Sequence, residues 1–418
     1  MTAGMSQTRK RRMPLRVRGR LLGTMAVAAA WSVGFAGVAP SAFAADVQSK
    51  QWYLSAMQAD KMWKISTGEG IKVAVIDSGV NSSTASLKGQ VLKGFDATGA
   101  EGDEYDDYRG HGTTMAELIA GTGNGGGLKG LAPGAKIIPV RITDTEFQNE
   151  HSVNAYDTRD AIKAAVDSEA QIISMSFGSE FPTTEEREAV KYAQSKGKLF
   201  FAAVGNEAEE GNEASYPAAY PEVVGVGATD AQAKVSDTSQ HGDFVDIAAP
   251  GDDLPFWCDQ NFSRYCQGNG GTSSATAITS AAAALIWSAH PEWTANQVLN
   301  VLFDTAGRDW EKGTLSNYLG HGIIRPAVNI LKGKGEPGAP DISPLTKEKT
   351  SGSAGSAAPS ASASSQPEKK EKAEDAAMAG SSTEKDDDSQ LGLIIGGVAA
   401  VLVLGGGAFA FARKRRAA

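Results

Sequence analysis

The chain has 418 residues, of which 41% are hydrophobic and 21% charged, so it is long enough to build at least one full-sized core. Two cysteines are too few for a cysteine-rich zinc module. Basic residues gather at the two ends, and the part between residues 45 and 412 holds 29 basic against 49 acidic residues. A body that acidic argues against binding to nucleic acid through phosphate contacts.

Residues 1–44 have the composition of a secretory signal peptide. Seven Lys or Arg residues precede the apolar run Leu21 to Val38, and the small-x-small sequence Ala42-Phe43-Ala44 follows it. A basic region, an apolar region and such a cleavage site are the three parts of a signal peptide. A retained first membrane span is the alternative. Arg11-Arg12 leaves twin-arginine export open beside the general secretory route.

Residues 45–334 alternate short apolar runs with amphipathic stretches. The apolar runs predict buried strands at 71–77, 135–142, 170–177, 198–205 and 222–229. The amphipathic stretches predict helices at 111–121, 154–169 and 183–196. This alternation favours an α/β fold with a mostly parallel central sheet and helices on both faces. Ligands of such sheets bind beyond the carboxyl ends of the strands, so functional residues are expected there.

A low-complexity stretch and a second apolar run follow this globule. Residues 335–390 are rich in Ser, Ala and Pro, and such a composition cannot bury enough surface to order itself, so we expect a disordered linker. Leu391 to Ala412 is a run of 22 residues without a charge, long enough for a transmembrane helix. Residues 413–418 begin with four basic side chains. Because positive residues stay in the cytoplasm, we expect a single-pass cell-membrane protein whose globule faces outside.

Three short segments of the globule carry candidate chemistry. Asp77 closes the apolar strand of VAVIDSGV, where it is either a functional carboxylate or a turn residue. His111 lies between two glycines in RGHGTT at the start of a predicted helix, which leaves its imidazole uncovered; a surface histidine is the alternative. Ser273 begins a helix of small residues in NGGTSSATAIT. Free N–H groups at a helix start suit an oxyanion, although an ordinary capping serine fits as well.

The order Asp77, His111, Ser273 in these three contexts resembles the subtilisin-like serine peptidases, the subtilases. Ser274 and Ala277 stand where that family usually has methionine and proline. Neither position takes part in the reaction, so these departures affect helix packing and not the three residues Asp77, His111 and Ser273.

The resemblance covers residues 51–332 and includes two further motifs. In AAVGNEA, Asn206 takes the family's oxyanion position and Gly205 precedes it in the substrate-binding region. In ISMSFGS, Ser176-Phe177-Gly178 matches the segment that pairs with substrate. An extended polypeptide is therefore the substrate that the resemblance implies.

The resemblance implies an endopeptidase that works through an acyl-enzyme intermediate. Ser273 would attack the scissile carbonyl, His111 would transfer the proton, and Asp77 would orient the imidazole. Asn206 and the Ser273 N–H would stabilise the oxyanion. This chemistry requires no cofactor and no metal. Family members often bind structural calcium, and the sequence does not identify a complete ligand set for it.

Cys258 and Cys266 lie shortly before the nucleophile in the sequence. Outside the cell two such cysteines can form a disulfide, and two free thiols are the alternative.

Four glutamates follow the oxyanion asparagine, namely Glu207, Glu209, Glu210 and Glu213. They are either a solvated charge run or a device that attracts basic residues to the scissile bond.

The layout of signal peptide, subtilase domain, linker, membrane helix and basic tail resembles the mycosins, peptidases associated with type VII secretion. Components of such a secretion system are therefore expected partners, beside the lipid bilayer and the polypeptide substrate. A general membrane-anchored subtilase is one alternative. A catalytically inactive, surface-tethered binding or scaffolding module is another. A lipase or esterase is disfavoured because no G-x-S-x-G sequence surrounds Ser273.

Overall fold

The computed structural model describes residues 44–144, 147–148, 158–268 and 270–350. The expected signal peptide up to residue 43, the membrane helix 391–412 and the basic tail lie outside these residues. Among the helices that the structure describes, none combines the length and the apolar character that crossing a membrane requires.

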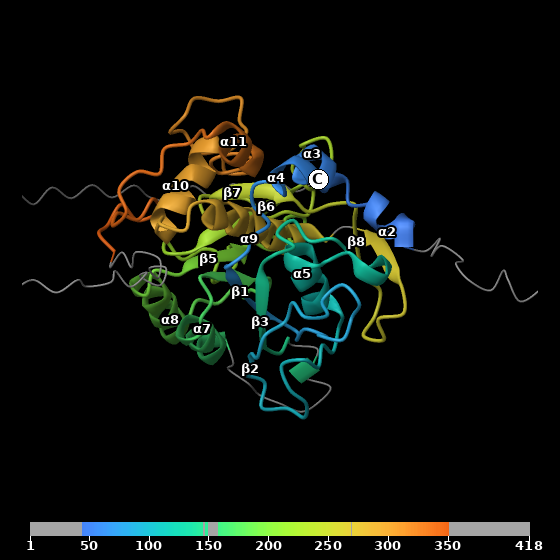
Figure 1. Cartoon of the computed structure of the whole chain (residues 1–418). Coiled ribbons are helices and arrows are strands. Elements are labelled where there is room, and N and C mark those ends of the chain that lie inside the picture. Colours follow the sequence, from blue (N-terminus) through green and yellow to red (C-terminus); the bar gives the residue numbers. More distant parts are fainter. Residues whose placement is uncertain (1–43, 145–146, 149–157, 269, 351–418) are drawn as a thin grey trace, which may run out of the picture. The chain divides into compact units, whose positions relative to one another are not determined.

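A parallel sheet forms the centre of the described part of the chain (Figure 1). Its seven strands follow the order β2-β3-β1-β4-β5-β6-β7. They are β1 (Lys72–Asp77), β2 (Phe95–Asp96), β3 (Lys136–Arg141), β4 (Ile172–Met175), β5 (Leu199–Ala203), β6 (Val224–Thr229) and β7 (Ile247–Pro250). The five predicted strands correspond to β1, β3, β4, β5 and β6, and the predicted parallel α/β fold is confirmed.

Helices cover both faces of this sheet (Figure 1). Val73 and Val75 of β1 face a core shared with α5 (His111–Ala120) and α9 (Gly271–Ala289). Ala74 and Ile76 alternate with them and face a second core, shared with α7 (Thr158–Asp167) and α8 (Thr184–Ser195). Because both faces are buried, the strands are apolar throughout, which is why their sequences could be recognised.

Further helices and a hairpin complete the fold. They are α2 (Ala44–Ser49), α3 (Trp52–Ala56), α4 (Ala59–Met62), the 3-10 turn η1 (Asn124–Gly126), α10 (Ala295–Thr305), α11 (Pro326–Lys332), and the hairpin strands β8 (Leu254–Trp257) and β9 (Tyr265–Gly268). The two strands of the hairpin are antiparallel.

The strand order brings the candidate residues to one edge of the sheet. Strands β1, β4 and β5 are neighbours, and all three run in the same direction. Asp77 is the last residue of β1, residues 176–178 follow β4, and residues 205–206 follow β5 shortly after its end. These residues therefore share the carboxyl edge, where α/β sheets bind their ligands.

The segment 335–350 lies along α10, although the sequence predicts that a disordered linker begins at residue 335. Asn300 donates its side-chain amide to the carbonyl oxygen of Pro337 (3.2 Å), and Asn296 donates to that of Pro340 (3.1 Å). The backbone N–H of Glu336 donates to Asp304 (3.1 Å). The described contacts thus continue past residue 334, where the sequence predicts that the linker begins. Polar side chains of α10 satisfy the backbone of this segment, a contact that its composition does not reveal.

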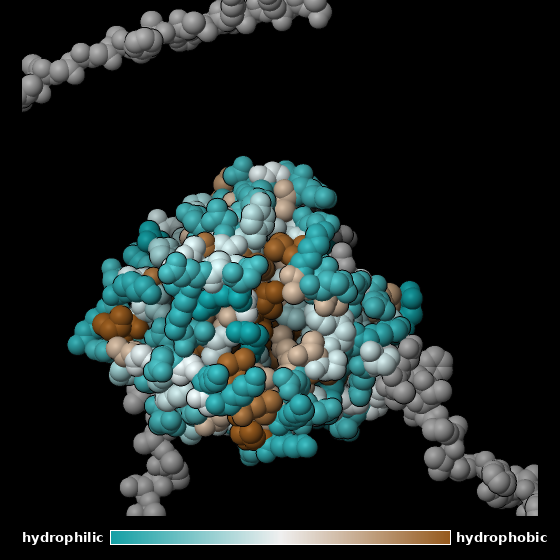
Figure 2. Space-filling model, turned by 90° about the horizontal axis from the view of Figure 1, so that it is seen from above, coloured by the Kyte–Doolittle hydropathy of each residue, from teal (hydrophilic) through white to brown (hydrophobic). Residues whose placement is uncertain are grey.

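Large apolar side chains are mostly withdrawn from the surface. On the face shown in Figure 2, hydrophilic side chains predominate and hydrophobic ones gather in a narrow band. The buried apolar side chains form the two cores on either side of the sheet.

Candidate active site

Asp77 and His111 form the central pair of the site. Asp77 is fully buried at the end of β1, and its Oδ1 atom lies 2.7 Å from Nδ1 of His111, the first residue of α5. The backbone N–H of Ser78 also donates to this oxygen (2.8 Å). Because a carboxylate only accepts hydrogen bonds, it places the proton of the neutral imidazole on Nδ1. The Nε2 atom is then free to accept a proton.

The pKa of His111 lies above the ordinary value of histidine. Burial lowers it, but the charge of Asp77, its hydrogen bond and the charge of Asp107 together outweigh that effect. The imidazole is still about one third exposed (34%), so a substrate can reach it. A base of this kind changes its charge near physiological pH.

Asp107 holds the loop that leads into α5, a role that the sequence analysis missed. Its Oδ1 atom accepts hydrogen bonds from the Ser78 hydroxyl (2.7 Å) and from the backbone N–H of Gly110 (2.8 Å). Its Oδ2 atom accepts from the backbone N–H and the hydroxyl of Thr113 (2.8 and 2.6 Å). An acidic residue shortly before a helix start is the signal that could have identified it.

A glycine is required directly after the histidine. A Cβ atom at Gly112 would lie 2.1 Å from the carbonyl oxygen of Gly79 and 3.0 Å from Cβ of Asp77. Real Cβ atoms do not approach other atoms so closely, and any side chain here would push α5 away from β1. The GHG sequence therefore permits the short contact between Asp77 and His111.

Ser273 lies in the first turn of α9 and is 6% exposed. Its hydroxyl makes a long hydrogen bond (3.5 Å) to the carbonyl oxygen of Ser176, just after β4. The next residue, Phe177, has its ring 6.0 Å from the His111 ring, measured between centroids. Ser176 and Phe177 are consecutive, so His111 and Ser273 both lie next to one short segment. The helices α5 and α9 are also packed against each other.

Asn206 is fixed by the residue before Ser273. Its Oδ1 atom accepts hydrogen bonds from the backbone N–H of Thr272 (2.9 Å) and from the Thr272 hydroxyl (3.1 Å). This arrangement directs the Nδ2 amide, a double donor, away from Thr272. Gly271 allows the close approach, since it has φ +57° and a Cβ atom there would lie 2.3 Å from Asn206 Oδ1. Hydrogen bonds thus connect the segment of the predicted oxyanion residue with that of the predicted nucleophile.

Two of the four predicted substrate-binding positions border a cavity of about 690 Å³. Phe177 and Gly178 line it, together with Tyr216 and Glu186. A Cβ atom at Gly178 would lie 2.1 Å from the hydroxyl of Ser215, so a larger residue here would require the Ser215 side chain to move. Gly205, the residue before Asn206, has φ +104°. Its backbone N–H donates to the Thr272 hydroxyl (3.3 Å).

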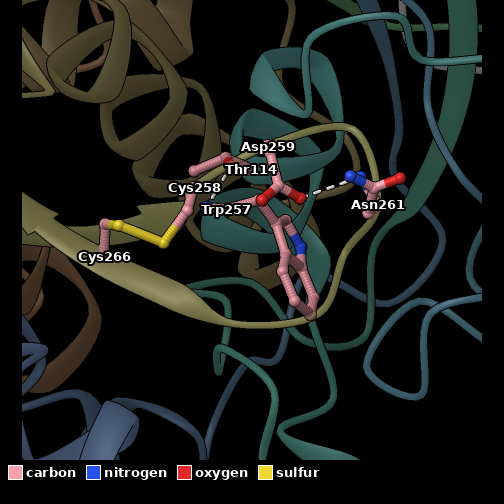
Figure 3. The surroundings of a disulfide bond; sticks show 6 residues. All are labelled: Thr114, Trp257, Cys258, Asp259, Asn261 and Cys266. Atoms are coloured by element: carbon pink, nitrogen blue, oxygen red, sulfur yellow. Dashed lines mark hydrogen bonds between the residues drawn. A yellow bond between two sulfur atoms is a disulfide. The ribbon is translucent and has the colours of Figure 1, made fainter.

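Cys258 and Cys266 are joined in a disulfide bond that closes the hairpin β8–β9 (Figure 3). The hairpin packs against α5. Within the residues that the structure describes, His, Cys, Asp and Glu form no group of three or more that could hold a metal ion.

The comparisons with known proteins point to one family. Residues 68–322 match the sequence model of the subtilase family. The chain is 37% identical over 219 residues to the major intracellular serine protease of Bacillus subtilis, which covers 50% of this chain and 67% of that protein. It is 33% identical over 280 residues to thermitase of Thermoactinomyces vulgaris, covering 65% and 95%. Among solved structures, the MycP3 protease from the type VII (ESX-3) secretion system superposes with a TM-score of 0.55 at 28% identity, covering 67% of this chain and 87% of that one.

Proposed function

Because the chain belongs to the subtilase family of serine peptidases, we propose that Asp77, His111 and Ser273 are its catalytic triad. The observation that carries this proposal is the 2.7 Å contact between a fully buried carboxylate and the His111 imidazole. The Ser273 hydroxyl lies beside the same segment 176–177 as that imidazole.

The reaction would proceed in two halves. The Ser273 Oγ atom attacks the scissile carbonyl carbon while Nε2 of His111 takes its proton, and Asp77 stabilises the imidazolium. The amide of Asn206 and the N–H of Ser273 donate to the oxyanion. His111 gives its proton to the leaving amine, which departs and leaves an acyl-enzyme. Water, activated by His111, then hydrolyses the ester and restores Ser273.

A polypeptide in extended conformation is the proposed substrate. The segment Ser176–Gly178 follows a strand of the sheet and lies next to the nucleophile, so it can pair with a substrate backbone. A fluorophosphonate probe tests the proposal directly, because only an activated serine reacts with it. Labelling that maps to Ser273, together with peptide hydrolysis, would support the enzyme. Absence of both would favour the alternative of a binding or scaffolding module.

We further propose that the enzyme is exported and anchored in the cell membrane with its catalytic domain outside. The basic and apolar N-terminal segment and the run 391–412 support this layout. Similarity to the MycP3 protease supports an association with a type VII secretion system. Cleavage of the catalytic domain from intact cells by an added protease, with retention of a C-terminal tag, is the expected result. A catalytic domain protected in intact cells would contradict the orientation.

Activity is expected to rise with pH along a limb whose midpoint lies above 6.5, the ordinary pKa of histidine. Asp77 raises the pKa of His111 against the opposing effect of burial. The base must be neutral, so activity is present above the raised pKa and is lost as the pH falls through it. The measurement is kcat/KM for a neutral peptide as a function of pH. A midpoint well below 6.5 would contradict this electrostatic picture.

Glu207 is expected to favour cleavage of substrates with a basic side chain near the scissile bond. Its carboxylate accepts a hydrogen bond from the backbone N–H of Asn206 (2.7 Å), so its charge lies beside the oxyanion residue. Glu207→Gln should lower the ratio of kcat/KM for Lys over Phe peptides by about threefold at low salt. Glu209→Gln, which removes an exposed charge from the same loop, is the matched control. Equal ratios in all three proteins would indicate a solvated charge run.

A further inference from the structure

The hairpin β8–β9 contacts α5, the helix that carries His111, on two successive turns. The backbone N–H of Trp257 donates to the Thr114 hydroxyl (3.1 Å), a contact within the view of Figure 3. The Tyr265 hydroxyl donates to Oε2 of Glu117 (2.7 Å). Thr114 and Glu117 are three residues apart and therefore lie on one face of the helix. The hairpin is thus hydrogen-bonded to α5 at Thr114 and Glu117, three and six residues after His111.

The disulfide closes the hairpin beside these two contact residues. Trp257 and Tyr265 are directly opposite in the strand register, and their rings stack with centroids 3.8 Å apart. Cys258 follows Trp257, Cys266 follows Tyr265, and the two cysteines are bonded to each other. Each strand has only four residues, and an isolated two-stranded hairpin of that length is marginally stable. The covalent bond therefore holds together the pair that contacts α5.

Glu117 ties the helix to the hairpin more firmly than an ordinary polar contact. It is fully buried, and its two carboxyl oxygens accept hydrogen bonds from Tyr265 and from the Thr84 hydroxyl (2.8 Å). A buried carboxyl group that loses a hydrogen-bond partner destabilises the folded protein. The hydrogen bond from Tyr265 to Glu117 therefore fixes the position of the hairpin relative to α5. Burial raises the pKa of Glu117 to about 7 despite these hydrogen bonds. Glutamine is therefore a close mimic of its neutral form.

The hairpin also abuts the residue before the histidine. Gly110 has φ +79°, and a Cβ atom there would lie 2.9 Å from the carbonyl oxygen of Asp259 and 3.2 Å from Cβ of Trp257. Little space therefore separates the hairpin from the start of α5. A displaced hairpin would change the position of the first turn, where His111 meets Asp77.

We propose that the disulfide-closed hairpin positions His111 through α5, with Glu117 as the positioning residue, so that turnover depends on the Cys258–Cys266 bond. The proposal rests on the proposed function of His111 as the catalytic base. It predicts a loss in kcat with little change in KM, because the hydrogen bonds described between the hairpin and the rest of the protein go to α5, and none of those described goes to Ser176–Gly178.

The first test compares the oxidised enzyme with the enzyme reduced by a dithiol. Each cysteine sulfur gains one electron and one proton, and the dithiol becomes a disulfide. Reduction, verified by alkylation of Cys258 and Cys266, should lower kcat at least about tenfold, since small misplacements of catalytic groups are that costly. The double variant Cys258→Ala/Cys266→Ala should show the same loss and no response to the dithiol. Unchanged kcat in enzyme with both thiols free would overturn the proposal.

The second test removes the contact between helix and hairpin. Tyr265→Phe and Glu117→Ala should each lower kcat about tenfold, whereas Glu117→Gln should retain most of it because its amide oxygen still accepts from Tyr265. Tyr192→Phe is the matched control, since it removes another 2.7 Å phenol–carboxylate bond, to Asp167, between α8 and α7. If Glu117→Ala does not fold, the kcat of Tyr265→Phe alone tests the proposal. Equal kcat in Tyr265→Phe and Tyr192→Phe would overturn the proposal.

Hydrogen exchange of residues 107–120 separates this proposal from the catalytic one. Amides of α5 should exchange faster in the reduced enzyme and in Tyr265→Phe, but not in Tyr192→Phe. If the wild type has no peptidase activity and α5 still loosens on reduction, the triad assignment fails while the coupling of hairpin and helix stands. If exchange of α5 does not respond, the positioning proposal fails whatever the activity.

Discussion

Replacing Ser273 by alanine is expected to lower peptide hydrolysis by about 10⁶-fold while the protein stays folded. The hydroxyl is the proposed nucleophile, and alanine has no group that can attack a carbonyl carbon. Among the described residues, the one hydrogen bond that the Ser273 hydroxyl makes is the long bond to Ser176, so its removal costs little stability. Alanine also suits a helix made largely of small residues.

Ser274→Ala is the matched control for this substitution. Ser274 is the next residue in the same turn of α9 and is similarly buried, but it has no place in the proposed reaction. The measurements are peptide hydrolysis, labelling by a fluorophosphonate and the thermal midpoint of unfolding. Ser274→Ala should retain activity and labelling, whereas Ser273→Ala should lose both at a similar midpoint. Full turnover by Ser273→Ala would refute the assignment of the nucleophile.

The parts of the fold that the sequence could predict are those with a strong local pattern. Strands such as β1 and β4 are buried on both faces, so their apolar runs are continuous and easily recognised. Strand β2 has two residues, which is too short for any periodicity to appear. Strand β7 has four residues, which give no clear strand signal of their own.

The candidate site could be predicted as a set of residues, but not its supporting contacts. Asp77, His111 and Ser273 stand in distinctive local sequences, whereas Glu117 looks like one polar residue in an amphipathic helix. Its burial depends on the hairpin, which meets α5 from about 150 residues further along the chain, as the separation of 148 residues between Glu117 and Tyr265 shows. Such long-range contacts leave no periodic signal in a single sequence.

Replacing Asp77 by asparagine is expected to lower kcat by about 10⁴-fold, the scale of loss that follows removal of the triad carboxylate. The backbone N–H of Ser78 and the Nδ1 atom of His111 both approach Oδ1. The asparagine should therefore place its amide oxygen at the position of Oδ1, where it can accept from both groups. Its amide nitrogen, itself a donor, would face two other donors in that position. His111 then keeps its tautomer, and the loss comes from the missing negative charge beside the developing imidazolium.

The pH profile of Asp77→Asn distinguishes this charge effect from a loss of orientation. The charge and hydrogen bond of Asp77 raise the pKa of His111 against burial. In the variant, burial should dominate, and the midpoint of the acid limb of kcat/KM should move to lower pH than in the wild type. Ser274→Ala, with Asp77 intact, should keep the wild-type midpoint. A large loss of rate at an unchanged midpoint would show that Asp77 acts by orienting the ring alone, and it would contradict the electrostatic role assigned to this carboxylate.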